Sequence, residues 1–230
     1  MKRDPADVAA LEESLRRRFR VVQTEVRVGA RAVSILHPAS AEDLIDERDF
    51  ERDERLPYWA ELWPSARVLG ELVATMDGHG RSAIELGCGA GLVTTCAALA
   101  GFDVVASDYY EDALRFARVN AARNGSRIRG ALLLDWRDLP SELERFELVL
   151  ASDVLYERPY GALVARVIAR LLRRGGQALV ADPGRVGREA FIASLPGLGL
   201  ALDSQTDHAF TDGEVHQVIS VLRIAWATEM

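Results

Sequence analysis

Short apolar runs alternate with helical patterns along the chain from about residue 82 onward. The runs contain few charges, which is typical of parallel strands that are covered by helices on both faces. Segments with helical spacing lie between them, so the pattern predicts an α/β fold. The predicted strands are 83–86, 103–107, 131–134, 148–152 and 177–181, and the predicted helices are 92–100, 111–124 and 160–172.

The end of the chain predicts a different strand arrangement. A turn at Arg173-Arg174-Gly175-Gly176 precedes the fifth strand, and a helix is expected at 188–194. Two further strands, near 200–205 and 216–222, follow each other directly. We therefore expect a Rossmann-like, doubly wound sheet of seven strands that is mostly parallel and ends in an antiparallel closing strand.

The first part of the chain has its own pattern. Leu11, Leu15 and Phe19 have the spacing of one helix face. The alternation over 21–36, with a turn near Gly29-Ala30, predicts a β-hairpin. Residues 37–56 are acidic and loop-like, with room for one short helix. We therefore divide the chain into an N-terminal helix and hairpin extension, 1–56, and a main domain, 57–230, which opens with a helix that runs to about Met76.

Composition restricts the classes of partner. At 230 residues and 49% apolar content, the chain can bury the core of one large domain. Its net charge of −7 is a poor match for nucleic acid. No apolar run approaches the roughly 18 residues of a membrane span, and the first residues lack the apolar core of a signal peptide. We therefore expect a cytoplasmic protein without membrane or nucleic-acid partners. The four histidines are scattered and the two cysteines lie eight apart, so we expect neither a metal site nor a disulfide framework.

Glycine stands at every second position after the first predicted strand. A dinucleotide fingerprint would place its third glycine at position 92, but this chain has it at Gly91. Glu85-x-Gly87-x-Gly89-x-Gly91 instead resembles motif I of the class I S-adenosylmethionine-dependent methyltransferases. A loop without side chains lets a ligand lie against the backbone and tolerates positive φ. The alternative is a tight turn without a ligand.

Two acids follow the next two strands. Asp108 lies roughly 20 residues beyond the glycine loop, where a carboxylate can accept both hydroxyls of a ribose; the alternative is a helix N-cap. Asp135 can accept from an adenine amino group and Trp136 can pack on the adenine ring, unless they are a turn aspartate and a half-buried tryptophan. Ligands in such folds bind at the carboxyl ends of the strands, where these residues fall.

Two tryptophans lie upstream of the first strand. Trp59 and Trp63 are four residues apart, which would place both on one face of a helix start. We assign Trp63 to the cofactor side, where it would enclose the methionine end of a donor, and Trp59 to the substrate side. Plain core packing is the alternative for both.

The fourth strand ends in Ser152-Asp153, with Tyr156 shortly after. Asp153-x-x-Tyr156 resembles the D-x-x-Y motif of methyltransferase family 16, the seven-β-strand protein-lysine methyltransferases. The Asn/Asp-Pro-Pro-aromatic segment of amino-directed nucleic-acid methyltransferases is missing here. Two more segments resemble the branch that modifies the electron-transfer flavoprotein β subunit: Pro57-Tyr58-Trp59-Ala60 with Trp63-Pro64, and Asp182-Pro183-Gly184-Arg185.

This resemblance covers about residues 57–190 and implies S-adenosylmethionine as the methyl donor. It implies that Asp153 and Tyr156 are the catalytic residues beside an acceptor amine, with Arg185 on the substrate side. A carboxylate raises the pKa of a nearby amine, so Asp153 would not ease deprotonation by its charge; its role would be to attract and orient the ammonium. The predicted cofactor site then comprises Trp63, Glu85, Gly87, Gly89, Gly91, Asp108, Asp135, Trp136 and Ser152.

The implied partner is a protein that carries the acceptor lysine, with the electron-transfer flavoprotein β subunit as the leading candidate. Glu61-Leu62 and Glu157-Arg158 depart from the family pattern near the expected acceptor mouth, so the identity of the substrate stays open. The alternatives are a small-molecule N- or O-methyltransferase and a non-catalytic S-adenosylmethionine-binding interaction module.

Overall fold

A computed structural model describes residues 5–41, 44 and 57–228. The helices are α1 (Pro5–Arg18), α3 (Pro64–Ala74), α4 (Leu92–Leu99), α5 (Glu111–Arg123), α6 (Arg158–Leu171) and α7 (Arg188–Ser194), with short 3-10 turns η2 (Tyr58–Ala60) and η3 (Pro196–Leu198). The strands are β1 (Val21–Val28), β2 (Arg31–Pro38), β3 (Ser82–Leu86), β4 (Asp103–Asp108), β5 (Gly130–Leu133), β6 (Phe146–Ser152), β7 (Leu172–Asp182), β8 (Leu200–Asp212) and β9 (Val215–Trp226). Most of the predicted acidic loop at 37–56 lies outside the described residues.

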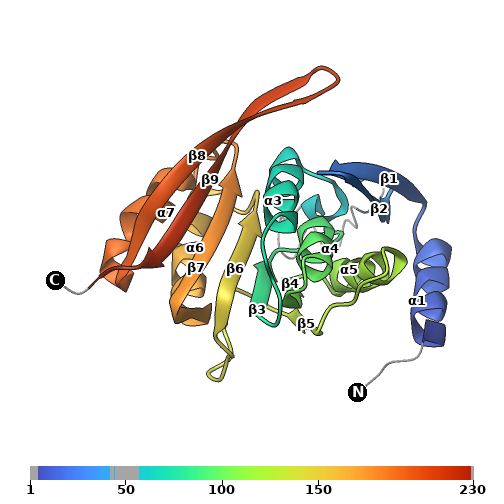
Figure 1. The fold of residues 1–230 in the computed structure, drawn as a ribbon, viewed down its shortest axis with the longest axis horizontal. Coiled ribbons are helices and arrows are strands. Elements are labelled where there is room, and N and C mark those ends of the chain that lie inside the picture. Colours follow the sequence, from blue (N-terminus) through green and yellow to red (C-terminus); the bar gives the residue numbers. More distant parts are fainter. Residues whose placement is uncertain (1–4, 42–43, 45–56, 229–230) are drawn as a thin grey trace.

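Seven strands form one sheet in the order β5-β4-β3-β6-β7-β9-β8 (Figure 1). Strands β3 to β7 pair in parallel, and β9 runs antiparallel to both of its neighbours. This confirms the predicted α/β sheet with its antiparallel closing strand. The chain proceeds from β3 to one edge and then returns to place β6 on the other side of β3. The point between β3 and β6 is therefore a topological switch point, where such folds bind ligands.

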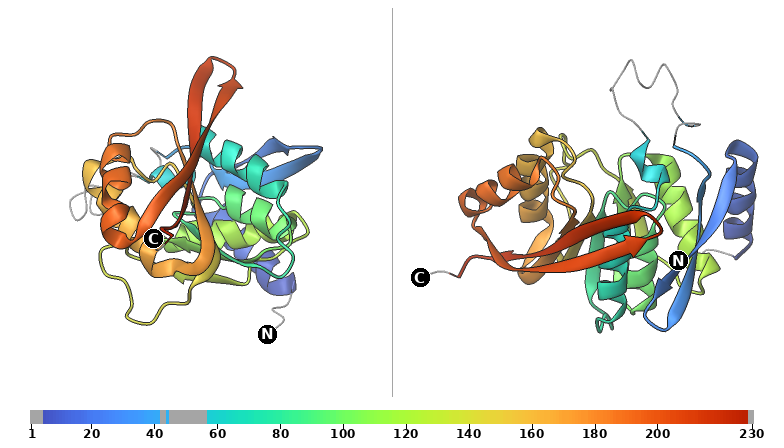
Figure 2. Two further views of the ribbon diagram at one scale, coloured as in Figure 1. Left: turned by 60° about the vertical axis from the view of Figure 1, so that its left-hand side comes forward. Right: turned by 90° about the horizontal axis from the view of Figure 1, so that it is seen from above.

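Both faces of the sheet are covered, as the apolar runs predict. In β6, Leu148 and Leu150 join the apolar cluster beneath α3 and α4, whereas Val149 and Ala151 join the cluster beneath α6 and α7. Figure 2 shows the corresponding layers of helices on opposite sides of the sheet. Successive residues of a strand point to opposite faces, so an uninterrupted apolar run is what this double packing requires.

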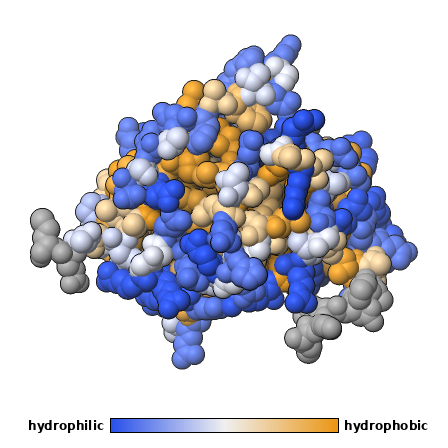
Figure 3. Space-filling view, in the orientation of Figure 1, coloured by the Kyte–Doolittle hydropathy of each residue, from blue (hydrophilic) through white to orange (hydrophobic). Residues whose placement is uncertain are grey.

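The last strands differ from their predicted lengths. The expected turn at 173–176 lies inside β7 as an irregularity: Phe146 pairs with Leu172, and Leu148 pairs with Gln177. The expected strands at 200–205 and 216–222 are 13 and 12 residues long and form a hairpin that projects beyond the sheet. Its projecting end is mostly hydrophilic (Figure 3) and exposed, so no apolar run marks it in the sequence.

The N-terminal helix and hairpin are present as predicted, with the turn at Gly29-Ala30 between β1 and β2. Leu15 of α1 packs with Leu36 of β2 and with Phe116 of α5. The inner face of the hairpin packs against the loop and helix that follow β3. No helix among the residues described here is long and apolar enough to cross a membrane.

Candidate active site

A cavity opens at the carboxyl ends of β3, β4 and β6, on the switch point of the sheet. It contains about 1160 Å³ of empty space, part of which belongs to its open mouth. It brings together, from five separate segments, most of the residues that the sequence singles out. Among the lining residues are Trp59, Trp63, Gly87, Gly89, Gly91, Asp108, Asp135, Trp136, Ser152, Asp153 and Tyr156; Glu85 and Arg185 are not among them.

The glycine loop has left-handed backbone at Gly87, Gly89 and Gly91, with φ of 66°, 51° and 84°. At Gly89 a Cβ atom would lie 2.9 Å from the backbone oxygen of Trp59. At Gly91 it would lie 2.5 Å from Ala117 of α5. The third glycine therefore permits close packing of the loop on a helix, whereas the loop itself borders the cavity.

Glu85 lies beneath the loop and is buried. Its carboxyl group accepts a hydrogen bond from the Thr94 hydroxyl, which fixes the end of β3 to the first turn of α4. Burial raises the pKa of Glu85 to about 8. This residue therefore supports the loop from behind.

Asp108 ends β4 and is 5% exposed. One carboxylate oxygen accepts the N–H of Gly89 at 2.9 Å, and the other accepts the N–H of Tyr110 at 3.0 Å. Burial raises the pKa of Asp108 to about 6, although these backbone donors oppose the rise. The carboxylate thus holds the glycine loop and also borders the cavity.

Asp135 and Trp136 lie at the end of β5. Arg137 donates to Asp135 from Nε at 2.9 Å and from its terminal nitrogen at 2.7 Å. The indole N–H of Trp136 is buried without a hydrogen-bond partner in the described part of the chain. An unsatisfied buried donor at a cavity wall is costly unless a ligand accepts from it.

Asp153 has the unusual backbone of this site. Its φ is 57°, a left-handed conformation in which Asp and Asn are better tolerated than most residues. One carboxylate oxygen accepts Nε of Arg185 at 2.6 Å, and the other accepts the Ser65 hydroxyl at 3.1 Å. The side chain of Asp153 is 5% exposed and that of Arg185 is 35% exposed. The predicted acceptor-side carboxylate is therefore already part of an ion pair.

The loop after β7 fixes Arg185. Asp182 is buried, and its carboxylate accepts the N–H of Gly184 at 2.8 Å and the N–H of Arg185 at 3.1 Å. Burial raises the pKa of Asp182. The Arg185 guanidinium also lies 5.3 Å from the centre of the Trp63 ring. The Asp182-Pro183-Gly184-Arg185 segment thus delivers one cation to Asp153.

Aromatic side chains form a continuous wall on this side of the cavity. Ring centroids are 5.9 Å apart for Trp63 and Tyr58, 5.6 Å for Tyr58 and Tyr156, and 4.9 Å for Tyr156 and Tyr160. Tyr160 in turn lies 6.0 Å from Trp136. The wall therefore connects the surroundings of Asp153 with those of Asp135.

The two tryptophans are not on one helix face. Trp59 lies in η2, and Trp63 precedes α3 and donates its indole N–H to the backbone oxygen of Tyr58 at 2.9 Å. Proline at position 64 begins a new helix, which breaks the expected register. Trp59 packs with Phe116 and lies beside Gly89, whereas Trp63 lies beside Arg185. Both tryptophans line the cavity, and their assignment to the cofactor and substrate sides stays a prediction.

Sequence reasoning missed Tyr160 and Arg137 as partners in the site, and it missed the bond between Ser65 and Asp153. Tyr160 follows Tyr156 by four residues on the first turn of α6, a spacing that the sequence does display. The bond from Ser65 to Asp153 joins positions 88 residues apart, so no local pattern indicates it.

Comparison with known proteins agrees with this architecture. A family model described as a methyltransferase domain matches residues 77–219, more than half of the chain. The chain belongs to this methyltransferase family. The match begins before β3 and ends within β9, so it spans the sheet and the cavity.

Individual relatives differ in their acceptors. The mouse protein-lysine methyltransferase METTL21E is 33% identical over 116 residues, 45% of this chain and 47% of that protein. The zebrafish electron transfer flavoprotein beta subunit lysine methyltransferase is 28% identical over 133 residues, 56% of this chain and 51% of that protein. The ubiquinone biosynthesis O-methyltransferase of Stutzerimonas stutzeri is 30% identical over 156 residues, 61% of this chain and 65% of that protein. The chain thus spans about half to two thirds of the length of these relatives.

A solved structure supports the fold. The N-methyltransferase NodS from Bradyrhizobium japonicum, in complex with S-adenosyl-L-homocysteine, has a TM-score of 0.57 at 19% identity and covers 80% of this chain and 97% of its own. S-adenosylmethionine is the cofactor of this methyltransferase family, and the residues present fit it. A side-chain-free loop, the Asp108 carboxylate and the unpaired Trp136 donor border one cavity.

Proposed function

We propose that this methyltransferase-family protein transfers a methyl group from S-adenosylmethionine to a lysine side chain of a protein. The observation that carries the proposal is Asp153, whose carboxylate lies with Tyr156 and Trp63 on the cavity beside the glycine loop. The similarity to two lysine methyltransferases supports the same acceptor.

The cofactor roles follow from the side chains at the strand ends. Asp108 would accept the two ribose hydroxyls, because each of its oxygens has a further lone pair beyond its backbone partner. Asp135 and Trp136 would hold the adenine, and a ring nitrogen would satisfy the orphaned indole N–H. Ser152 and the three glycines line the remaining floor, and Glu85 positions the loop.

The donor supplies a methyl group on a sulfonium, which is electrophilic without activation. The protein therefore has to align the acceptor nitrogen with that methyl group, which is catalysis by proximity and orientation. The acceptor is the harder partner, since lysine has a reference pKa near 10.4 and only about one in 10³ is neutral at pH 7. The site must gather an ammonium and then favour loss of its proton to water.

The ion pair of Asp153 with Arg185 would serve both to bind the ammonium and to allow loss of its proton. The carboxylate orients a cation, but alone it would raise the pKa of the acceptor amine and keep it protonated. Arg185, bonded at 2.6 Å, offsets that effect. The ring faces of the aromatic wall would attract the ammonium, and the low polarity of the wall would disfavour its charged form and so favour loss of the proton to water at the open mouth of the cavity.

The test is transfer of isotope-labelled methyl groups to purified electron-transfer flavoprotein, the leading candidate partner, and to a host lysate, with mass spectrometry of the labelled species. Asp153→Asn is the informative variant because Asn also accepts left-handed backbone. It should bind S-adenosylhomocysteine within a few fold of the unchanged protein, while transfer falls about 10²-fold through lost orientation. Label on lysine that depends on Asp153 supports the proposal; near-normal transfer by Asp153→Asn contradicts the role of this residue.

A second candidate is a small-molecule O-methyltransferase. The ubiquinone biosynthesis O-methyltransferase matches a larger part of this chain than either lysine methyltransferase, and an aromatic wall also suits a flat organic acceptor. Label that appears only in small metabolites would favour this second function.

A further inference from the structure

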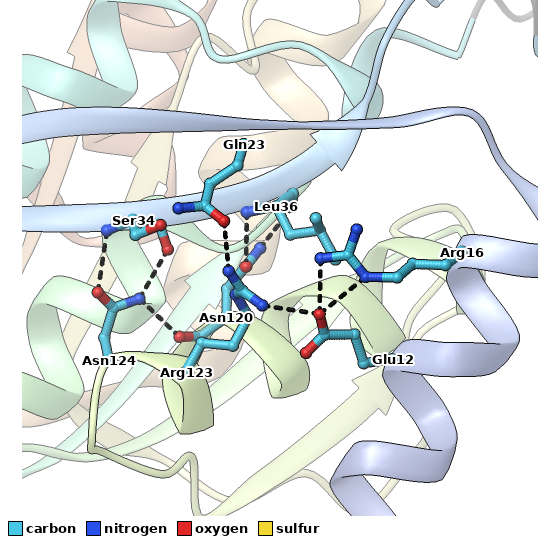
Figure 4. A network of polar contacts seen from close by, with 8 residues as sticks. All are labelled: Glu12, Arg16, Gln23, Ser34, Leu36, Asn120, Arg123 and Asn124. Carbon is cyan, nitrogen blue, oxygen red and sulfur yellow. Dashed lines mark hydrogen bonds and ion pairs between the residues drawn. The ribbon is translucent and has the colours of Figure 1, made fainter.

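Asn120 of α5 and Asn124, which caps the end of α5, take the place of a neighbouring strand for the open edge of β2. Asn124 accepts the N–H of Ser34 at 2.9 Å and donates to its backbone oxygen at 2.8 Å. Asn120, one turn earlier, accepts the N–H of Leu36 at 2.8 Å and donates to its oxygen at 2.7 Å. Figure 4 shows both amides between the helix and the strand. The N-terminal hairpin is thus bonded to α5 through its backbone.

Asn120 makes one contact that Asn124 does not. Its second amide hydrogen is donated to the backbone oxygen of Ala90 at 2.8 Å. Asn120 is fully buried and does not line the cavity, so it reaches the glycine loop from behind. Rotating the amide by 180° would set its oxygen against two carbonyl groups, so the three contacts fix its orientation.

Ala90 lies between two left-handed glycines, a stretch of backbone with little conformational preference of its own. Asp108 holds the Gly89 N–H on the cavity side, and the Cys88 oxygen accepts the Gly91 N–H at 2.8 Å. Asn120 supplies a further side-chain contact, at the Ala90 oxygen. Ala90 also packs on Val33 and Ile35 of the hairpin.

We propose that Asn120 is a positioning residue for the methyl donor: it joins the N-terminal hairpin to the glycine loop and holds the loop in the form that receives the donor. The inference concerns the donor half of the site and is independent of which acceptor the protein uses. It assigns the hairpin a role in cofactor binding although no hairpin residue lines the cavity.

The experiment compares Asn120→Ala with Asn124→Ala. Both variants lose a pair of bonds to the β2 backbone, but only the first loses the contact with the loop. Titration calorimetry with S-adenosylhomocysteine should show affinity reduced about tenfold in Asn120→Ala and within about twofold in Asn124→Ala. Urea unfolding of both variants separates a general loss of stability from this effect. Equal affinities in the two variants, at matched stability, would overturn the proposal.

A measurement on the unchanged protein serves if Asn120→Ala does not fold. Coupling between two sites is reciprocal, so S-adenosylhomocysteine should slow hydrogen exchange of the Leu36 amide more than that of the Ser34 amide. Equal protection of the two amides contradicts the proposal. A protein that does not bind S-adenosylhomocysteine at all overturns the donor assignment and this inference together, which distinguishes that failure from a wrong acceptor.

Discussion

At the scale of single residues, three carboxyl groups at or near the cavity differ in their hydrogen-bond partners. Glu85 meets a hydroxyl and a buried backbone, Asp108 meets two backbone N–H groups, and Asp153 meets a guanidinium and a hydroxyl. Of these three, Asp153 is the one whose partner carries a full opposite charge. The three acids, which lie at the ends of the neighbouring strands β3, β4 and β6, therefore differ in their hydrogen-bond partners and in the charge beside them.

Asp108 should control donor binding in a pH-dependent way. Asp108→Ala would remove the two charge-assisted hydrogen bonds that we propose to the ribose, together worth roughly 3 kcal/mol or more, so affinity for S-adenosylhomocysteine should fall about 10²-fold. In the unchanged protein the affinity should fall as pH drops through about 6, because the carboxyl group then takes up a proton. Calorimetry between pH 5 and pH 8 checks both; unchanged affinity in Asp108→Ala refutes the ribose assignment.

Glu85 should make stability depend on pH. Its pKa in the folded protein is raised from 4.5 to about 8, so its contribution is fully present below about 4.5 and is lost as pH rises through about 8. Glu85→Gln keeps an acceptor for Thr94 but cannot ionise. Urea unfolding should show a smaller loss of stability between pH 6 and pH 9 for Glu85→Gln than for the unchanged protein, whereas Glu214→Gln on an exposed turn should follow the unchanged protein. Parallel curves for all three proteins would refute the assignment.

The Arg185 charge should be visible in a pH profile. Arg185→Gln removes the cation beside Asp153, so the acceptor amine should keep its proton to higher pH and the pH–rate profile should move to alkaline values. Arg185→Lys retains the charge and should stay closer to the profile of the unchanged protein. Equal profiles for the Gln and Lys variants would show that the charge of Arg185 does not set the protonation of the acceptor.

At the scale of elements, the strands and helices bring the site residues together, and the sequence predicts only part of this arrangement. Alternating strands and helices predict the sheet, and therefore the shared edge at which Asp108, Asp135 and Asp153 end their strands. The break between Trp59 and Trp63 follows from Pro64, which the helical spacing alone does not reveal. The bond between Ser65 and Asp153 depends on tertiary packing and has no local signal. Sequence patterns thus locate the site, while long-range contacts decide which side chains pair within it.

The junction between the loop after β3 and helix α5 permits a test at the scale of elements. Gly91→Ala would place a methyl group 2.5 Å from Ala117 at a φ of 84°, so the free energy of unfolding should fall by about 2–5 kcal/mol. Gly125→Ala has a φ of 75° with no atom within 4 Å and should cost only about 1–2 kcal/mol. Urea unfolding of the two variants measures the difference; equal losses would mean that the close approach of loop and helix is not limiting.

The N-terminal extension connects the element scale to the whole molecule. We keep the division into an extension, 1–56, and a methyltransferase domain, 57–230, as a proposal about the organisation of the chain. In the described part of the extension, Leu15 and Leu36 pack on Phe116 of α5. Asn120 of α5 donates hydrogen bonds to the backbone oxygens of Leu36 and of Ala90 and so joins the extension to the glycine loop. Through these contacts the extension would help to hold the glycine loop in the form that binds the donor.

The overall charge of the molecule bears on its partner. With a net charge of −7 and with Glu61 and Glu157 at the cavity, the protein should recognise a basic or neutral protein segment, because opposite charge is attracted and an acidic segment is repelled. For a protein acceptor, kcat/KM should therefore fall as salt rises, because exposed charges are screened beyond about 8–10 Å. Glu61→Gln with Glu157→Gln should weaken that salt dependence and leave S-adenosylhomocysteine affinity within about twofold, since long-range steering acts on the encounter of the two proteins. Rates measured from low to high salt with a labelled donor provide the check. A salt-independent rate would contradict electrostatic steering, and label found only in metabolites or RNA would replace the protein acceptor with one of those classes.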